Sequence, residues 1–150
     1  MRRFFLIVLT IILTMSLAYA DNGLIEVKSS YAVKKTADRL ETLLKEKGMT
    51  IFTRINHSEG AKKAGIDLPA TELIIFGNPK VGSPLMQCNR TVGIDLPQKA
   101  LIWQDENGQV WLSYNDPRYL SKRHGLSECM QVIKKVEKAL SNFAKAATMP

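Results

Sequence analysis

The sequence is poor in the side chains that carry most protein chemistry, since only two of its 150 residues are cysteine and two are histidine. Cys88 and Cys129 lie far apart, so the C-x-x-C motif of thioredoxin-type oxidoreductases is absent. No Gly-x-Ser-x-Gly sequence marks a hydrolase nucleophile, and neither His57 nor His124 stands in the spacing of a metal site. The sequence identifies no catalytic residue and leans away from an enzyme, without deciding the question.

A complete phosphate-binding loop is also lacking. The stretch GNPKVGSP from Gly77 has the G-x4-G spacing of that motif, but Ser83 and Pro84 occupy the places of its Lys and Ser/Thr. Ser83 and Pro84 instead predict the start of a short helix, whose free N–H groups, with Lys80 nearby, could bind a carboxylate or phosphate. A plain capped turn is the alternative.

Acidic residues are outnumbered, with 14 Asp and Glu against 21 Lys and Arg and a net charge of +7. The lysines are scattered along the chain, which argues against nucleic acid as a partner. A modest positive charge favours anionic surfaces, although a solvated, lysine-rich surface explains it more simply.

The N-terminal segment is typical of a secretion signal. Two arginines precede an apolar stretch over residues 4–13, and residues 18–20 form an Ala-Tyr-Ala cleavage site with no cysteine after it. We expect a signal peptide over residues 1–20, a single mature domain over residues 21–150 and no stable membrane anchor after cleavage. The predicted location is periplasmic or secreted, and an uncleaved anchor is the less favoured alternative.

Periodicity predicts two long helices and five strands. Hydrophobic residues recur at helical spacing over residues 33–44, before Gly48, and over residues 129–143. Alternating or continuous apolar residues predict the strands, and Asn107-Gly108 marks a hairpin between the last two. The strands are LIEVKS from Leu24, MTIFTRIN from Met49, ELIIFG from Glu72, LIWQD from Leu101 and VWLSY from Val110.

The order of these elements predicts an α+β fold, in which an antiparallel sheet carries both long helices on one face. Short helical insertions are expected after the second strand, with Ser58 as N-cap, and after the third strand, and Asp116 should cap a further short helix. Residues 73–76 are expected at the centre of the sheet, because they are apolar at every position.

The pentapeptide GIDLP occurs twice, beginning at Gly65 and at Gly93. At both places we expect the glycine to take the left-handed conformation that ends a short helix, and the proline to lead into a strand. Five residues are too few to indicate an internal duplication. We therefore favour independent origins for the two segments, each of which leads from a short helix into a strand.

Five ordered motifs resemble those of the family of the domain of unknown function 302. They are His57 after the second strand, FGNPKVGSPLMQ from Phe76, IDLP from Ile94, the hairpin at Gly108 and SYNDP from Ser113. The resemblance covers residues 24–143 and implies a TATA-box-binding-protein-like fold with a β-α-β4-α layout, but no agreed activity. The family often has Asp before the histidine, where this chain has Asn56, so a role that needs a carboxylate beside His57 is not implied.

The two cysteines form an even pair, which in an exported protein predicts a disulfide between Cys88 and Cys129. It would close a loop of about 40 residues and contribute roughly 4 kcal/mol in the chain-entropy model. Two buried free thiols, or a reactive thiol, are the alternatives.

These features predict a non-enzymatic domain that binds a small anionic or amphipathic ligand, or a protein partner, between the sheet and the short helices. The candidate ligand-binding residues are Asn78, Lys80, Ser83, Tyr114 and His57. The third and fifth strands should run the same way, which groups Lys80, Ser83 and Tyr114 at one edge and separates His57.

A thiol- or metal-dependent redox accessory protein is the alternative function. It would use Cys88, Cys129 and His57, whose soft ligands suit copper, although no spacing predicts a metal site. The sequence indicates no particular cofactor, and a homodimer is compatible with it.

Overall fold

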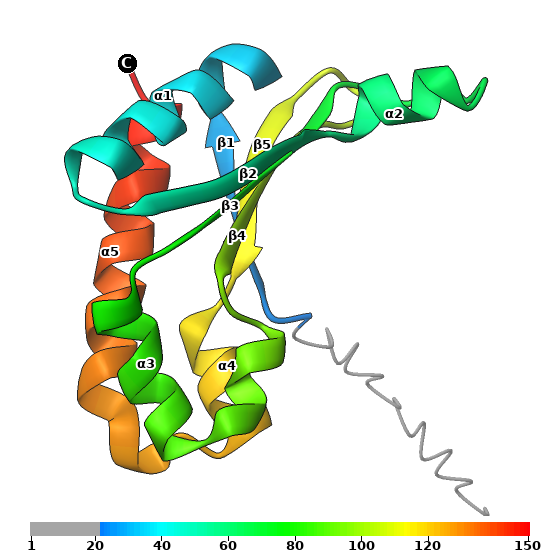
Figure 1. The fold of residues 1–150 in the computed structure, drawn as a ribbon. Helices are drawn as coiled ribbons and strands as arrows, with labels where there is room; N and C mark the ends of the chain where they lie inside the picture. The colour runs from blue at the N-terminus through cyan, green and yellow to red at the C-terminus, as the bar shows by residue number, and fades with distance from the viewer. Residues whose placement is uncertain (1–21) are drawn as a thin grey trace, which may run out of the picture.

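The computed structural model describes residues 22–150, so the predicted signal peptide over residues 1–20 lies outside the described residues. Five strands form one antiparallel sheet in the order β1-β5-β4-β3-β2 (Figure 1). The strands are β1 (Leu24–Ser29), β2 (Thr50–Asn56), β3 (Thr71–Gly77), β4 (Gln98–Gln104) and β5 (Val110–Asn115).

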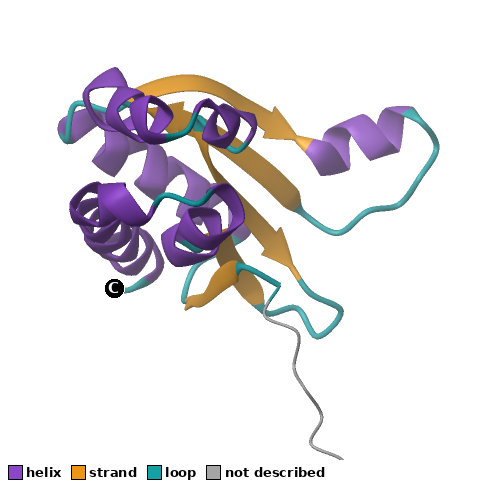
Figure 2. Ribbon diagram, turned by 90° about the horizontal axis from the view of Figure 1, so that it is seen from below, coloured by secondary structure: helices purple, strands orange, loops and turns teal. Residues whose placement is uncertain are grey.

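Two long helices, α1 (Val33–Glu46) and α5 (Met130–Thr148), cover one face of the sheet (Figures 1 and 2). Each helix buries one apolar stripe, which in α1 includes Ala37, Leu40 and Leu44. The sheet faces them with buried residues at alternate positions of its strands. The predicted α+β fold, with an antiparallel sheet and both long helices on one face, is confirmed.

The centre of the sheet is β4, so the prediction that residues 73–76 form the central strand is wrong. Burial alternates along β3: Ile74 and Phe76 are buried against the helices, whereas Leu73 and Ile75 are only partly covered on the outer face. A continuous apolar run here reflects a half-covered outer face, rather than a strand buried on both faces.

Short helical segments fill the connections between these elements. They are α2 (His57–Lys63), α3 (Pro79–Cys88), η1 (Arg90–Ile94), α4 (Pro117–His124) and η2 (Ser127–Cys129). Asp116 caps α4 as predicted, because its side chain accepts the N–H two residues further on at 2.8 Å. The other two predicted caps are wrong, since Asn56 caps α2 in place of Ser58, and Asn78 caps α3 in place of Ser83. In both cases an Asn at the end of the preceding strand accepts a first-turn N–H group, so the helix begins before the serine.

The two GIDLP segments have different structures. Gly65 follows α2 with φ of 75°, which is the expected left-handed conformation. Gly93 lies inside η1 and is not left-handed, so the prediction is wrong for the second copy. Pro97 leads into β4 through a cis peptide bond. The repeated letters therefore do not reflect a repeated structure.

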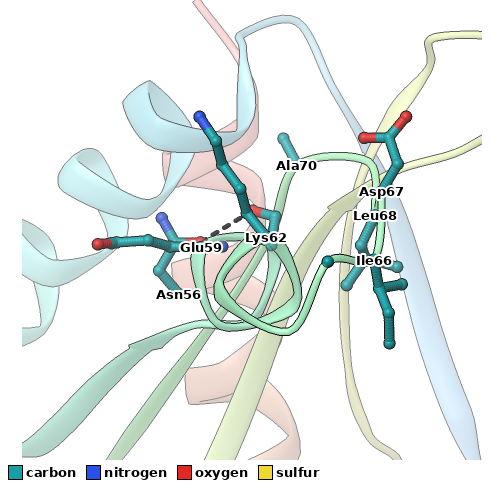
Figure 3. Close-up of a pocket in the computed structure, with 9 residues that line it drawn as sticks. Asn56, Glu59, Lys62, Ile66, Asp67, Leu68 and Ala70 are labelled. Carbon is teal, nitrogen blue, oxygen red and sulfur yellow. Dashed lines mark hydrogen bonds between the residues drawn. The ribbon is translucent and has the colours of Figure 1, made fainter.

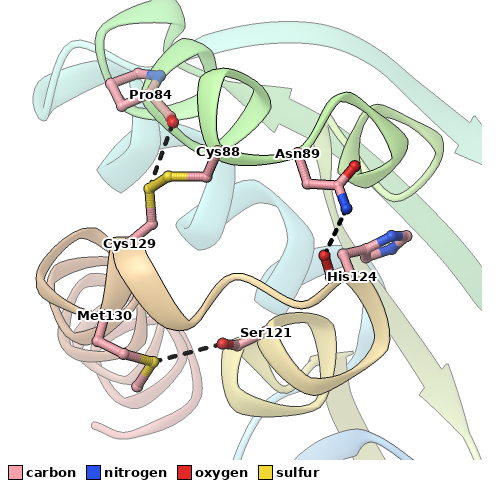
Figure 4. The surroundings of a disulfide bond; sticks show 7 residues. All are labelled: Pro84, Cys88, Asn89, Ser121, His124, Cys129 and Met130. Carbon is pink, nitrogen blue, oxygen red and sulfur yellow. Dashed lines mark hydrogen bonds between the residues drawn. A yellow bond between two sulfur atoms is a disulfide. The ribbon is translucent and has the colours of Figure 1, made fainter.

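Cys88, at the end of α3, and Cys129, at the end of η2, form the disulfide predicted from the sequence, with Cα atoms 6.5 Å apart (Figure 4). The bond joins α3 to the segment that begins α5. Within residues 22–150, no helix has the length and hydrophobicity needed to span a membrane.

Candidate functional site

The five predicted site residues lie in three separate environments. His57 begins α2 at one end of the sheet, whereas Asn78, Lys80 and Ser83 lie in or next to α3 at the opposite end (Figure 1). Tyr114 is buried in the core with only 5% of its surface exposed. The structure therefore brings together Asn78, Lys80 and Ser83 and separates them from the other two.

Burial of Tyr114 also changes its chemistry. The pKa of the Tyr114 hydroxyl is raised, mainly because burial disfavours the charged form, with further contributions from the negative charges of Asp116 and Glu137. In the structure Tyr114 packs in the core and lines neither of the two hollows described below.

The helix start predicted at Ser83 is not formed. Helix α3 begins at Pro79, so Ser83 lies inside the helix rather than at its start. Asn78 accepts the N–H groups of residues 80–82, with its side chain at 2.9 Å and its carbonyl at 2.9 and 3.0 Å. The first three backbone N–H groups of α3 therefore already have acceptors and are not free to bind an anion.

An apolar cavity of about 540 Å³ lies instead between the ends of β3 and β4, helix α3 and helix α5. Of the predicted site residues, Asn78 and Ser83 line it, and Lys80, Tyr114 and His57 do not. Most of the lining is hydrophobic: Met49, Phe52, Phe76, Val81, Leu85, Met86, Leu96, Pro97, Val136, Ala139, Leu140 and Phe143.

The cavity has a buried floor and an exposed apolar rim. Phe76 and Leu85 on the floor are only 1% and 3% exposed, whereas Phe52 on the rim is 55% exposed. Val81 and Met86 are also exposed. Large apolar side chains that gather at the mouth of a hollow are typical of a binding site.

Helix α5 supplies one wall of the cavity. Lys135, Ala139 and Phe143 follow one another at steps of four residues and all line it, so they form one stripe along the helix. Ile133 and Ala144 lie outside the lining and are buried in the core. The small side chain of Ala139 leaves room in the middle of the wall.

The charged residues of the lining are both lysines, Lys47 and Lys135, and no acidic residue lines the cavity. Both lysines are exposed. Neither makes an ion pair with any residue in the described part of the chain. The rim of an apolar cavity therefore carries positive charge that is not neutralised by the protein.

A second hollow of about 700 Å³ lies beside α2, at the other end of the sheet (Figure 3). It is more open and is lined by charges of both signs, including Glu59, Lys62 and Asp67. Asn56 contributes its side chain to the cap of α2, where it accepts the N–H of Glu59 at 2.8 Å. Since α2 has no buried residue, this hollow lacks a packed wall.

His124 is buried in a hydrogen-bonded network between η1 and α4. Its Nε2 lies 2.6 Å from Asp95 Oδ2, and its Nδ1 lies 3.0 Å from Thr91 Oγ1. The side-chain amide of Asn89 donates to the His124 carbonyl at 2.8 Å (Figure 4). The Asp-His-Thr order resembles a catalytic relay, but neither of the two hollows described above includes these residues. The network holds η1 against the end of α4.

The positions of Cys88, Cys129 and His57 give no support to the alternative function of a redox accessory protein. Both cysteines are in the disulfide, and no group of three or more His, Cys, Asp or Glu within residues 22–150 is placed to hold a metal ion. His57 begins α2, which lies at the opposite end of the sheet from α3 and its disulfide.

Two curated relatives are similar to part of this chain. It is 53% identical over 106 residues to the fluoride-specific ion channel FluC 1 of Brucella suis biovar 1 (strain 1330), a match that covers 71% of this chain and 42% of that protein. FluC 1 of Brucella abortus biovar 1 (strain 9-941) matches with the same identity over 39% of its length. The chain thus spans less than half of the length of these relatives.

The chain has the same fold as a protein whose structure has been solved. The crystal structure of an uncharacterized conserved DUF302 protein from Bacillus stearothermophilus has a TM-score of 0.76, with 22% sequence identity, over 84% of this chain and 98% of that chain. The model of the family described as domain of unknown function DUF302 matches residues 25–143. The resemblance seen in the five sequence motifs is confirmed, and the chain belongs to the DUF302 family.

Proposed function

We propose that this domain binds a small amphipathic ligand in the cavity between the sheet, α3 and α5. The observation that carries the proposal is the cavity of about 540 Å³, with exposed Phe52, Val81 and Met86 at its rim. Exposure of large apolar side chains to water costs about 25 cal/mol per Å² of surface, so a cluster of them is typical of a surface that contacts another molecule.

The size of the cavity fits a small molecule. Ligand pockets have volumes of about 300–1,000 Å³ and combine apolar walls with a few polar groups, which Asn78 and Ser83 provide here. A short hydrocarbon chain or a compact ring system is of this size.

Binding of the fluorophore anilinonaphthalene sulfonate tests the proposal. We expect the folded protein to bind it, and Ala139→Phe to weaken binding about tenfold, because a ring at this position fills the middle of the cavity. Ala146→Phe is the matched control, since Ala146 is exposed on the same helix outside the lining.

Cooperative thermal unfolding of each variant shows whether probe binding reports the folded state rather than a loosened one. Equal probe binding by the two folded variants would contradict the proposal. If Ala139→Phe does not fold, Ala139→Leu fills less of the cavity and serves the same comparison.

A second candidate function follows from the Brucella relatives. We propose that the domain also acts as an accessory of a fluoride-specific channel, because 106 residues of it match part of proteins with that name at 53% identity. We expect the protein to co-purify with such a channel, and its removal to make cells more sensitive to fluoride. Unchanged fluoride tolerance together with no co-purification would rule this function out.

We propose further that the domain works outside the cytoplasm, after loss of residues 1–20. The N-terminal pattern supports this, as does the disulfide, because disulfides persist mainly in oxidising compartments. Mass spectrometry of the exported protein should find Asp21 at its N-terminus. Protein that retains residues 1–20 would contradict the prediction.

A further inference from the structure

We infer that the ligand of this cavity is a linear amphiphile with a negatively charged head group, which Lys135 binds at the cavity mouth. The inference rests on the proposed function and specifies its ligand class. It depends on the sign of the charge at the rim and on the position of that charge relative to the apolar wall.

The sign of the rim charge selects an anion. Three exposed lysines elsewhere in the described chain pair with a carboxylate one turn away: Lys34 with Asp38, Lys45 with Glu41 and Lys63 with Glu59. Lys47 and Lys135 have no such partner in the described part of the chain, and no carboxylate lines the cavity. An anionic head group is therefore attracted to the rim and a cationic head group repelled.

The position of Lys135 favours a linear molecule. Lys135 begins the stripe of α5 that continues through Ala139 to Phe143, and the eight residue steps from one end to the other span about 12 Å at a rise of about 1.5 Å per residue. One end of this wall is charged and the rest is apolar. An extended hydrocarbon chain with its charge at Lys135 matches that order.

Lys47 is a weaker candidate than Lys135 for binding the head group. It is the C-cap of α1, so the partial negative charge of the helix end lies close in sequence and offsets part of its positive charge. Lys47 adds to the positive potential of the rim, whereas the ammonium group of Lys135 lies beyond the first turn of α5 and is free of this compensation.

Calorimetric titration with three amphiphiles that share a dodecyl chain tests the inference. The probes are dodecanoate, the neutral dodecyl maltoside and dodecyltrimethylammonium, each as monomers at low ionic strength. We expect dodecanoate to bind about tenfold more tightly than the cation, and this preference to shrink at high salt, because salt screens charges at an exposed rim.

Charge reversal locates the head group. Lys135→Glu should weaken dodecanoate binding about five- to tenfold and improve binding of the cation. Lys134→Glu changes the net charge equally on the same helix but lies outside the lining, and should leave both affinities nearly unchanged. Equal losses in the two variants would overturn the assignment to Lys135.

The outcomes separate this inference from the proposed function. Equal affinity for all three amphiphiles overturns the charge selection but leaves an apolar binding site. Failure of every amphiphile and of anilinonaphthalene sulfonate to bind removes the proposed function itself. Binding to phosphatidylglycerol vesicles without binding to monomeric dodecanoate would place the anion at a bilayer surface and overturn the inference of a ligand inside the cavity.

Discussion

At the residue scale, buried polar groups are satisfied within the fold: no buried side-chain nitrogen or oxygen in the described part of the chain lacks a hydrogen-bond partner. The network around His124 is the clearest case, because it connects this residue to Asn89, Thr91 and Asp95, which lie 29 to 35 residues earlier in the sequence. Removing one partner leaves another buried polar group without a hydrogen bond. Single substitutions in this network should therefore lower the free energy of unfolding substantially.

Asp95→Asn should lower the free energy of unfolding by about 1–3 kcal/mol, because it removes the charge that lies next to the buried His124 ring. Asp67→Asn is the matched control, since Asp67 occupies the same place in the first GIDLP segment but is exposed. That control should change stability by less than about 0.5 kcal/mol. Denaturation with urea measures both, and similar losses would show that the network contributes little.

The raised pKa of Tyr114 predicts that the protein loses stability at alkaline pH. The folded pKa of this residue is raised above the ordinary value of 10.0, so its contribution is complete below that pH and is lost as the pH rises through the folded pKa. The melting temperature of the wild type should therefore fall more steeply above about pH 10 than that of Tyr114→Phe. Parallel pH profiles of the two proteins would contradict this expectation.

At the element scale, one arginine ties a helix to two strands. Arg54 on β2 donates to Glu72 on β3 at 2.6 Å, and to Asp38 and Glu41 on α1 at 2.7 and 3.3 Å. The pKa of Asp38 is lowered by hydrogen bonds from Lys34 and then Arg54. The pKa of Glu41 is lowered as well, chiefly by its hydrogen bond from Lys45 and further by that from Arg54.

Arg54→Met should destabilise the protein by about 2–3 kcal/mol near neutral pH, because Glu72 is then left largely buried without its partner. Lowered carboxyl pKa values contribute stability above the unfolded values of 3.8 and 4.5, and this contribution is lost as the pH falls. Thermal unfolding between about pH 7 and pH 3 should therefore show a shallower acid loss in the variant than in the wild type. An equal acid loss in both would show that Arg54 does not set the acid dependence.

The sequence predicts the strands and long helices well, because each depends on a periodicity that is visible within ten to twenty residues. It predicts the start of α3 poorly, because Asn78-Pro79 and Ser83-Pro84 satisfy the same local rule. A tertiary contact accompanies the first pair: the side-chain amide of Asn78 donates to the Gly48 carbonyl at 3.3 Å.

The cavity was not predicted for a related reason. Its lining combines residues from β2, β3, α3 and α5. Within its own segment, each of these residues has the pattern of an ordinary core or surface position. The sequence predicts Ser83 at a helix start, whereas in the structure Ser83 lines the cavity from within α3. Exposure of an aromatic residue such as Phe52 appears only once neighbouring elements are in place.

At the scale of the whole molecule, the disulfide connects the two helical walls of the cavity. Cys88 ends α3, and Cys129 directly precedes α5, so the bond limits how far these helices separate. The cross-link also restricts the unfolded chain, because it joins two cysteines with a sequence separation of 41.

Replacing both cysteines by Cys88→Ser and Cys129→Ser should lower the free energy of unfolding by about 4 kcal/mol and weaken binding of anilinonaphthalene sulfonate. The first effect comes from the less restricted unfolded chain, and the second from looser cavity walls. Thermal unfolding and probe titration measure them separately. Unchanged stability on replacement, or on reduction of the wild type, would show that the bond does not constrain the fold.

Helix α2 and the loop after it extend beyond the end of β2, away from α3 (Figures 1 and 2). Because α2 buries none of its residues, a change on its surface leaves the core and the cavity untouched. A dye attached through Lys63→Cys, the free thiol of an otherwise disulfide-bonded protein, would respond to an approaching protein but not to a small molecule in the cavity. Helix α2 thus offers a labelling position that is independent of the cavity.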